Sequence, residues 1–246
     1  MKKRYYVLDA LRGFAIVNMI FYHAMWDVVN MFRVSAPWFK SDVGHVWQQC
    51  ICWSFILVSG FCWNFGKKKL RNAVVTLAAS VIITAVTAVF IKNSIILFGV
   101  LSLLGSSILV MIPLDKLVKK LNPFIGFGVF FLLFLVTKNI SDGAVGIGDK
   151  VLFEIPRELY ANYFTAYLGF PFRGFYSADY FPLIPWLFLF VCGYFIYHIF
   201  TRLNLMKYLS SFRCRPLELL GRYSLIIYMA HQPVVYAVLF LIFTFV

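Results

Sequence analysis

Five polar or charged side chains share one face of an otherwise apolar stretch near the start of the chain. On a helical wheel with 100° per residue, all of them fall within about 40° of the central histidine. An ionised group at the centre of a membrane helix costs roughly 2.5–3.5 kcal/mol or more, so this face is predicted to point toward protein or water. The five residues are Asp9, Arg12, His23, Asp27 and Asn30.

His23 and Asp27 have the chemistry of a general base and its orienting partner. A carboxylate four residues after a histidine lies on the same helix face, where it can hold one imidazole tautomer and stabilise the protonated ring. His231 lies at a comparable depth in the last apolar segment, and Asp179 precedes the sixth. These four groups are predicted to converge near the outer leaflet. The alternative for a membrane histidine is a purely structural hydrogen bond, which we prefer for His198.

The composition is that of a polytopic membrane protein. Of the 246 residues, 62% are hydrophobic and 13% are charged, whereas a soluble domain is about half apolar and a quarter charged. The net charge of +13 does not indicate nucleic-acid binding, because Lys and Arg gather in cytoplasmic loops whatever the protein binds. The cysteines predict neither a disulfide nor a metal site, because no second Cys/His cluster completes a metal shell.

Seven apolar segments are long enough to cross a bilayer, which predicts an all-α bundle forming a single domain over residues 1–246. The sixth segment follows Pro182 and Pro185 and reaches Phe200, and the seventh is expected to kink near Pro233. A basic loop, residues 201–215, separates these two. The first five segments are 6–32, 46–65, 72–91, 94–114 and 124–137.

Loop charges predict the orientation of this bundle. With a cytoplasmic N-terminus, fifteen of the 23 Lys and Arg residues fall in inner segments and seven in outer ones. This bias predicts an N-in, C-out protein. The inner residues include Lys2, Lys3, Arg4, Lys67, Lys68, Lys69 and Arg71, and the outer ones include Lys92.

A long extracytoplasmic loop is predicted before the sixth helix. Its length of roughly forty residues is unusual for a connection and indicates a functional segment. The second half, from Glu158 to Tyr180, is aromatic and rich in Gly and Pro. This composition is typical of an interfacial or re-entrant segment that packs back onto the helices.

Five sequence blocks resemble the heparan-alpha-glucosaminide N-acetyltransferase catalytic-domain family, in its bacterial branch and within the transmembrane acyltransferase superfamily. The resemblance extends over nearly the whole chain. The blocks are LDALRGFAIVNMIFYHAMWD from Leu8, LVSG from Leu57, FGVLSLLG from Phe98, SADYFPLIPW from Ser177 and GRYSLIIYMAHQP from Gly221.

The resemblance implies an enzyme that moves an acetyl or acyl group from cytosolic acyl-CoA to a sugar amine or hydroxyl outside the cytoplasm. Under it, His23 oriented by Asp27 deprotonates the acceptor, with a histidine-acetyl intermediate as the variant. His45 is a second candidate base, because the histidine of the family is described as lying beyond the first helix. The residues then expected to bind the acceptor are Asn30, His45, Asp179, His231 and Gln232. Those expected to bind the phosphates of acetyl-CoA are Arg12, Lys67, Lys68, Lys69 and Arg71.

Two other functions are compatible with a polar stripe in a membrane helix. A transporter could use it as a pathway, although paired Gly/Pro-broken helices do not recur in two halves of the sequence. A non-catalytic envelope assembly factor could use it only to pack helices. The expected location is a bacterial inner membrane, the expected acceptor is an envelope glycan or another small molecule, and a homodimer is left open.

Overall fold

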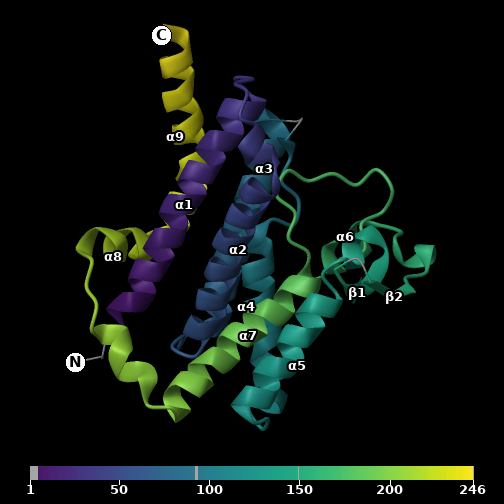
Figure 1. Ribbon diagram of the computed structural model, residues 1–246, viewed down its shortest axis with the longest axis vertical. Coiled ribbons are helices and arrows are strands. Elements are labelled where there is room, and N and C mark those ends of the chain that lie inside the picture. Colours follow the sequence, from purple (N-terminus) through teal and green to yellow (C-terminus); the bar gives the residue numbers. More distant parts are fainter. Residues whose placement is uncertain (1–4, 92–93, 149, 246) are drawn as a thin grey trace. The chain divides into compact units, whose positions relative to one another are not determined.

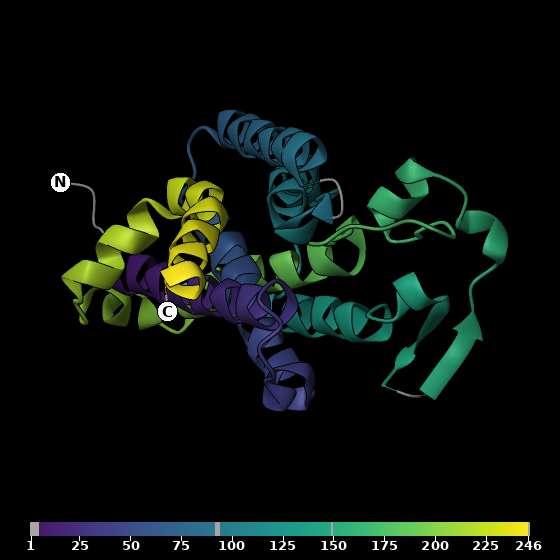
Figure 2. The same ribbon diagram turned by 90° about the horizontal axis from the view of Figure 1, so that it is seen from above.

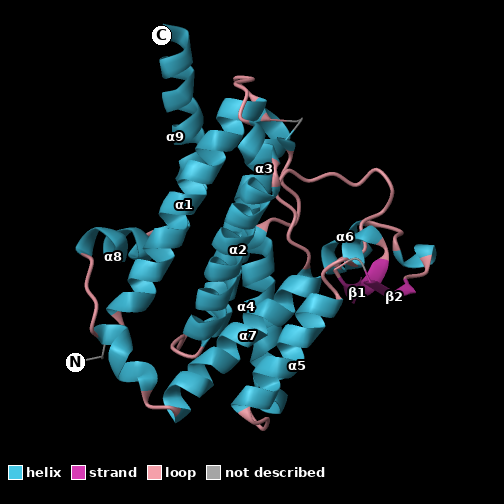
Figure 3. Cartoon of the chain, viewed as in Figure 1, coloured by secondary structure: helices cyan, strands magenta, loops and turns pink. Residues whose placement is uncertain are grey.

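The computed structural model describes residues 5–91, 94–148 and 150–245, and helices dominate it (Figure 1; Figure 3). The chain divides into two compact units, one made of Met1–Val58 and Leu203–Val246 and the other of Ser59–Arg202. Among the charges used for the orientation, Lys2, Lys3, Arg4 and Lys92 lie outside the described residues.

The first unit joins the beginning and the end of the sequence. Helix α9 lies beside α1 in both views (Figure 1; Figure 2), and the short helix α8 packs against α1 as well. The helices are α1 (Tyr6–Asn30), the first part of α2 (Asp42–Trp63), α8 (Arg215–Arg222) and α9 (Ser224–Phe245), with 3₁₀ turns at Pro37–Lys40 and Leu205–Ser210.

Two glycines allow the close approach of α1 and α8. A Cβ atom at Gly13 would overlap the carbonyl oxygen of Leu217, and one at Gly221 would overlap the carbonyl oxygen of Asp9. Small residues at helix contacts let backbones meet in membrane proteins, where association depends on van der Waals packing. This contact anchors the N-terminal half of α1 to the segment that precedes α9.

Replacing Gly13 with alanine tests this contact. We expect Gly13→Ala to destabilise the protein by about 1–3 kcal/mol, because the added methyl group forces the two backbones apart. The measurement is thermal unfolding in detergent micelles. Gly128→Ala is the matched control, since a Cβ at this helical position meets open space and alanine has the higher helix propensity. Equal melting temperatures for the two variants would contradict the packing argument.

The second unit is built around α4 and α7, the most deeply buried of its apolar helices. Helix α3 packs on α4 with Leu77 against Gly105, and α5 packs on α7 with the ring of Phe195 against Gly126. The last residues of α2 join this core through Gly60, which touches the backbone of Phe190. The helices are α3 (Lys69–Phe90), α4 (Val100–Val118), α5 (Pro123–Val136), α6 (Tyr163–Leu168) and α7 (Leu183–Arg202).

The long connection between α5 and α7 folds into a small structure of its own. It contains the antiparallel strands β1 (Ala144–Ile147) and β2 (Lys150–Glu154), helix α6, and 3₁₀ turns at Ile140–Asp142 and Arg157–Leu159. Two tyrosine hydroxyls fasten it, since Tyr160 donates to the carbonyl oxygen of Ile140 and Tyr180 to that of Ala166. Burial raises the pKa of both phenols, so they remain protonated donors.

The fourth helix begins later than predicted. Residues 94–98 were expected to be helical, but α4 starts at Val100. Phe98 has a positive φ of 54°, and its carbonyl oxygen accepts from the backbone nitrogen of Phe181, at 2.9 Å. Ser177 also bonds the backbone of Leu97, at 2.9 and 2.8 Å. The segment therefore pairs with the chain entering α7, which joins two of the five sequence blocks.

The predicted last helix is in fact two helices. It breaks at Tyr223, whose φ of −98° and ψ of 18° leave the helical region, and α9 then continues through Pro233. The break thus lies before the proline, next to Gly221, which packs against α1, and the kink near Pro233 stays a prediction.

Six helices of the described chain are long and apolar enough to cross a membrane. Helix α1 is not among them, although its 25 residues would span about 37 Å at 1.5 Å per residue. A polytopic helical membrane protein is thus supported, while the seventh span and the N-in, C-out orientation stay predictions. The six segments are Asp42–Trp63, Lys69–Phe90, Val100–Val118, Pro123–Asp142, Leu183–Arg202 and Ser224–Phe245.

Candidate functional site

Two histidines from opposite ends of the sequence meet in the first unit. The ring centroids of His23 in α1 and His231 in α9 lie 4.8 Å apart, with their planes tilted by 57°. The Nδ1 atom of His231, which is buried, lies 2.6 Å from the carbonyl oxygen of Tyr228. A carbonyl can only accept, so Nδ1 carries the hydrogen and the neutral ring has its lone pair on Nε2. This is the tautomer that a general base requires.

Asp27 and Gln232 form the second pair of this cluster. The Nε2 atom of Gln232 donates to both carboxylate oxygens of Asp27, at 2.9 and 3.1 Å, and Asp27 is fully buried. Within the described residues, its carboxylate thus hydrogen-bonds to Gln232 rather than to His23, the partner predicted from the i, i+4 spacing. The Oε1 atom of Gln232 is buried and has no partner in the described part of the chain. It can accept a hydrogen bond from an amine or a hydroxyl group.

A cluster of three aromatic side chains, Tyr22, Phe39 and Trp47, lies next to His23 and was not predicted from the sequence. The ring of Tyr22 packs against Phe39 at 5.0 Å and against Trp47 at 5.4 Å. The indole of Trp47 donates to Oδ1 of Asn18, at 3.1 Å. These contacts fix α1 against the start of α2 and thereby limit how far the helix carrying His23 can rotate.

Other predicted residues of the first unit lie outside this cluster. Asn30 is exposed, and its Nδ2 atom donates to the carbonyl oxygen of Trp26 in its own helix. His45 is exposed in the first turn of α2, not in a loop as predicted, because α2 already begins at Asp42. Arg12 is partly buried on α1, about three helical turns before His23.

Asp179 belongs to the second unit and has a structural contact there. Its Oδ2 atom accepts from the backbone nitrogen of Val100, at 3.4 Å. The carboxylate therefore sits at the N-terminus of α4, where unpaired N–H groups and the helix dipole favour negative charge. This contact accounts for a carboxylate at position 179, and a part in acceptor binding stays a prediction.

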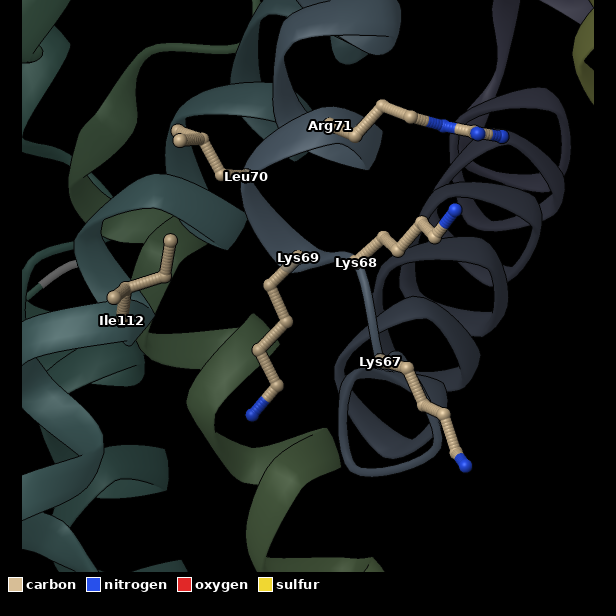
Figure 4. A pocket seen from close by; sticks show the side chains of 6 residues that line it. All are labelled: Lys67, Lys68, Lys69, Leu70, Arg71 and Ile112. Carbon is tan, nitrogen blue, oxygen red and sulfur yellow. The ribbon is translucent and has the colours of Figure 1, made fainter.

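The predicted basic cluster lines a pocket of about 450 Å³ at the turn between α2 and α3. Figure 4 shows Lys68 and Arg71 extending to the same side, whereas Lys69 extends in another direction. Lys67, Lys68 and Arg71 are exposed. The pocket therefore presents three exposed cations, which suits an anion with several phosphate groups. Its lining residues are Lys67, Lys68, Lys69, Leu70, Arg71 and Ile112.

Lys69 differs from the other three cations. Its Nζ atom lies 3.0 Å from the centre of the Trp63 ring, a cation–π contact. Trp63 packs in turn on Tyr194, whose hydroxyl donates to Asp115 at 2.7 Å, and the ring of His198 lies 4.5 Å from that of Tyr194. This polar network between helices was not predicted. The Nε2 atom of His198 is buried and has no hydrogen-bond partner among the described residues, so the structural hydrogen bond expected of His198 stays a prediction.

A comparison with protein families identifies the family of this chain. The family described as "Heparan-alpha-glucosaminide N-acetyltransferase, catalytic" matches residues 4–233. The chain belongs to this family. The resemblance seen in the sequence blocks is thus confirmed, and His23, Asp27, His231 and Gln232 all lie inside the matched range. Comparisons with curated proteins and with solved structures gave no significant match.

Membership in the N-acetyltransferase family indicates a membrane-embedded acetyltransferase, in agreement with the six apolar helices. Acetyl-CoA is the donor that the family uses in general. The matched range draws on both compact units and includes the residues of the histidine cluster and of the basic pocket.

Proposed function

We propose that this protein transfers an acetyl group from acetyl-CoA to an amine or hydroxyl of a sugar on the extracytoplasmic side of a bacterial inner membrane. The observation that carries the proposal is the cluster of His23, Asp27, His231 and Gln232, in which Asp27 and His231 are buried, within a chain of the N-acetyltransferase family. Ionisable groups inside a membrane helix bundle are costly and are usually functional.

The proposed reaction needs a base and a means of holding the acceptor. The acceptor nitrogen or oxygen attacks the thioester carbonyl carbon, its proton passes to a histidine, the C–S bond breaks, and the coenzyme leaves as a thiolate that is then protonated. The Nε2 atom of His231 has the lone pair for this proton, and His23 beside it is the second candidate. The Oε1 atom of Gln232 accepts a hydrogen bond from the acceptor, and Asp27 positions Gln232.

The variant mechanism passes through a covalent intermediate. A histidine nitrogen then attacks the thioester first, and the acetyl-imidazole formed is cleaved by the acceptor. The two routes differ in one observation, because only the covalent route releases one equivalent of free coenzyme per protein when no acceptor is present. We propose direct transfer; the lone pair on Nε2 of His231 can serve either as base or as nucleophile, so the release of free coenzyme decides between the two routes.

The acceptor is best sought with a panel of sugars. Purified protein in vesicles is supplied with radiolabelled acetyl-CoA and either glucosamine-type or hydroxyl-bearing glycans, and labelled product is counted. Acetyl transfer to any of them supports the enzyme. Absence of coenzyme binding, thioester hydrolysis and transfer with every acceptor would overturn it and favour a transporter or an assembly factor. Asp179→Asn and Asn30→Ala test the remaining acceptor contacts in the same assay.

The basic pocket is proposed to bind the phosphates of the coenzyme. We expect Lys67→Ala, Lys68→Ala and Arg71→Ala together to weaken acetyl-CoA binding by about 10- to 100-fold, because each charge-assisted hydrogen bond contributes roughly 1.5–3 kcal/mol and partial solvent exposure reduces it. Binding is measured by titration calorimetry at two salt concentrations, and the loss is expected to shrink at high salt.

A second basic segment supplies the matched control. Lys116, Lys119 and Lys120 are also exposed, in the last turn of α4 and just after it. Replacing all three by alanine removes three positive charges, as the pocket variant does, at positions that do not line the pocket. If this control weakens coenzyme binding as much as the pocket variant does, the effect is one of overall charge and the pocket assignment is wrong. Arg12→Ala, in the other unit, tests separately whether α1 contributes a phosphate contact.

A further inference from the structure

The β-hairpin between α5 and α7 exposes an apolar strand. Val151, Leu152 and Phe153, three consecutive residues of β2, have exposed fractions of 56%, 67% and 58%, and Ile147 on β1 has 49%. A strand facing water on one side normally alternates apolar and polar residues. β2 instead has charged residues only at its ends, Lys150 and Glu154.

Strand β2 contains a β-bulge at Leu152. Val145 pairs with Phe153 and Gly146 pairs with Val151, so Leu152 is the extra residue on β2. A bulge bends the strand and redirects its side chains. Leu152, the most exposed of the three apolar side chains, is thus the residue of β2 that has no directly opposite partner on β1.

The hairpin is tied to the ends of two apolar helices. Val145 on β1 and Ile155 after β2 are buried in one cluster, against which Val136 at the end of α5 and Ile184 at the start of α7 pack. Figure 1 shows β1 and β2 beside this end of α5. Because α5 and α7 belong to segments that are long and apolar enough to cross a membrane, the hairpin lies at the level where these helices leave the bilayer.

The connections around the hairpin keep it in this place. The backbone nitrogen of Ile155 donates to the carbonyl oxygen of Gly143 at 2.9 Å, and Nδ2 of Asn139 donates to the carbonyl oxygen of Gly148 at 2.9 Å. These two hydrogen bonds and the apolar cluster hold the hairpin at the ends of α5 and α7.

We propose that the exposed apolar residues of this hairpin insert into the interfacial region of the lipid bilayer. Burying apolar surface there stabilises the contact by about 25 cal/mol per Å², and long charged residues at the ends of an inserted segment can extend to the headgroups. The continuity of the hairpin with two apolar helices favours lipid over a second copy of the chain as the occupant. This anchoring does not depend on the acetyltransferase activity.

Spin labelling tests the insertion. Leu152→Cys and, as matched control, Glu158→Cys in the exposed turn after β2 are made in a full-length chain whose five native cysteines are replaced by alanine or serine. Both are reconstituted in phosphatidylcholine–phosphatidylglycerol vesicles, and the collision rates of the label with oxygen and with a water-soluble nickel chelate are compared. We expect oxygen to dominate at position 152 and the nickel chelate at position 158.

Two outcomes would overturn the proposal. If the nickel chelate dominates at position 152 as well, the hairpin faces water. If the label at position 152 is protected from both reagents and shows spin–spin broadening that disappears on dilution with unlabelled protein, a second copy of the chain covers it. The melting temperature in detergent verifies that the variant is folded, and we expect it unchanged because Leu152 is exposed.

Discussion

His231→Ala lowers the rate of acetyl transfer by about 10²- to 10⁴-fold, the contribution expected of a general base. His23→Ala causes a loss of the same order, because the two rings are in contact and act as one unit. Groups that act together give non-additive losses, so the double variant is hardly slower than either single one. The measurement is transfer of label from acetyl-CoA at saturating donor, with the melting temperature checked for every variant.

The replacement His231→Asn separates a base from a structural histidine. The side-chain amide of asparagine can replace Nδ1 as donor to the carbonyl oxygen of Tyr228, but it has no basic lone pair. If His231 is the base, His231→Asn is as inactive as His231→Ala although it melts like the native protein. If His231→Asn is active, the role of His231 is only to donate a hydrogen bond to the backbone carbonyl of Tyr228. His45→Ala is the control and keeps its activity, since His45 is exposed at the start of α2; loss of turnover in this variant alone would make His45 the base.

Replacing either member of the Asp27–Gln232 pair is the second change with a large expected effect, on stability as well as on activity. Asp27→Ala leaves the amide of Gln232 without its acceptor, which costs about 1–3 kcal/mol. Gln232→Ala costs more, because it leaves the Asp27 carboxylate buried without donors. The double variant loses less than the sum of the two, with a coupling of about 0.5–3 kcal/mol. Unfolding in detergent, followed by circular dichroism, measures all three.

A distant pair is the control for this coupling. Thr244 on α9 is exposed and donates to the carbonyl oxygen of Phe240 in its own helix. It lies about 18 Å along the helix from Gln232 at 1.5 Å per residue, so Asp27→Ala and Thr244→Ala are expected to add within about 0.5 kcal/mol. Additive losses for Asp27→Ala and Gln232→Ala would show that the hydrogen bonds contribute nothing to the folded state and would contradict the arrangement. A loss of activity without loss of stability would place Asp27 in acceptor binding instead.

The sequence predicted that residues of α1 and α9 come together, but it did not predict the hydrogen bonds that their side chains make. Helical periodicity placed His23 and Asp27 on one face, and counting residues from the helix starts placed His231 at a similar depth. Spacing within one helix cannot show that a carboxylate will prefer an amide on another helix, so the bond from Asp27 to Gln232 was missed. The tautomer of His231 was missed for the same reason, because it depends on a backbone carbonyl three residues earlier.

Helix ends were the least predictable part of the fold. Residues 94–98 are as apolar as the helix that follows, so hydropathy cannot distinguish the segment from the helix. Its conformation is set by hydrogen bonds to residues 177–181, about eighty positions later in the chain. The network of Trp63, Lys69, Asp115 and Tyr194 was missed in the same way, because each residue taken alone looked like an ordinary helix-end or core residue.

The pairing of the first and last helices has a consequence for biosynthesis. Asp27 and its partner Gln232 are 205 residues apart, so at a translation rate of about 5–20 residues per second, α1 leaves the ribosome roughly 10–40 s before α9. During this interval its buried carboxylate has no Gln232 to bond with. We expect the insertion machinery to hold α1 until α9 arrives, and a ribosome stalled before α9 to leave α1 exposed to membrane proteases.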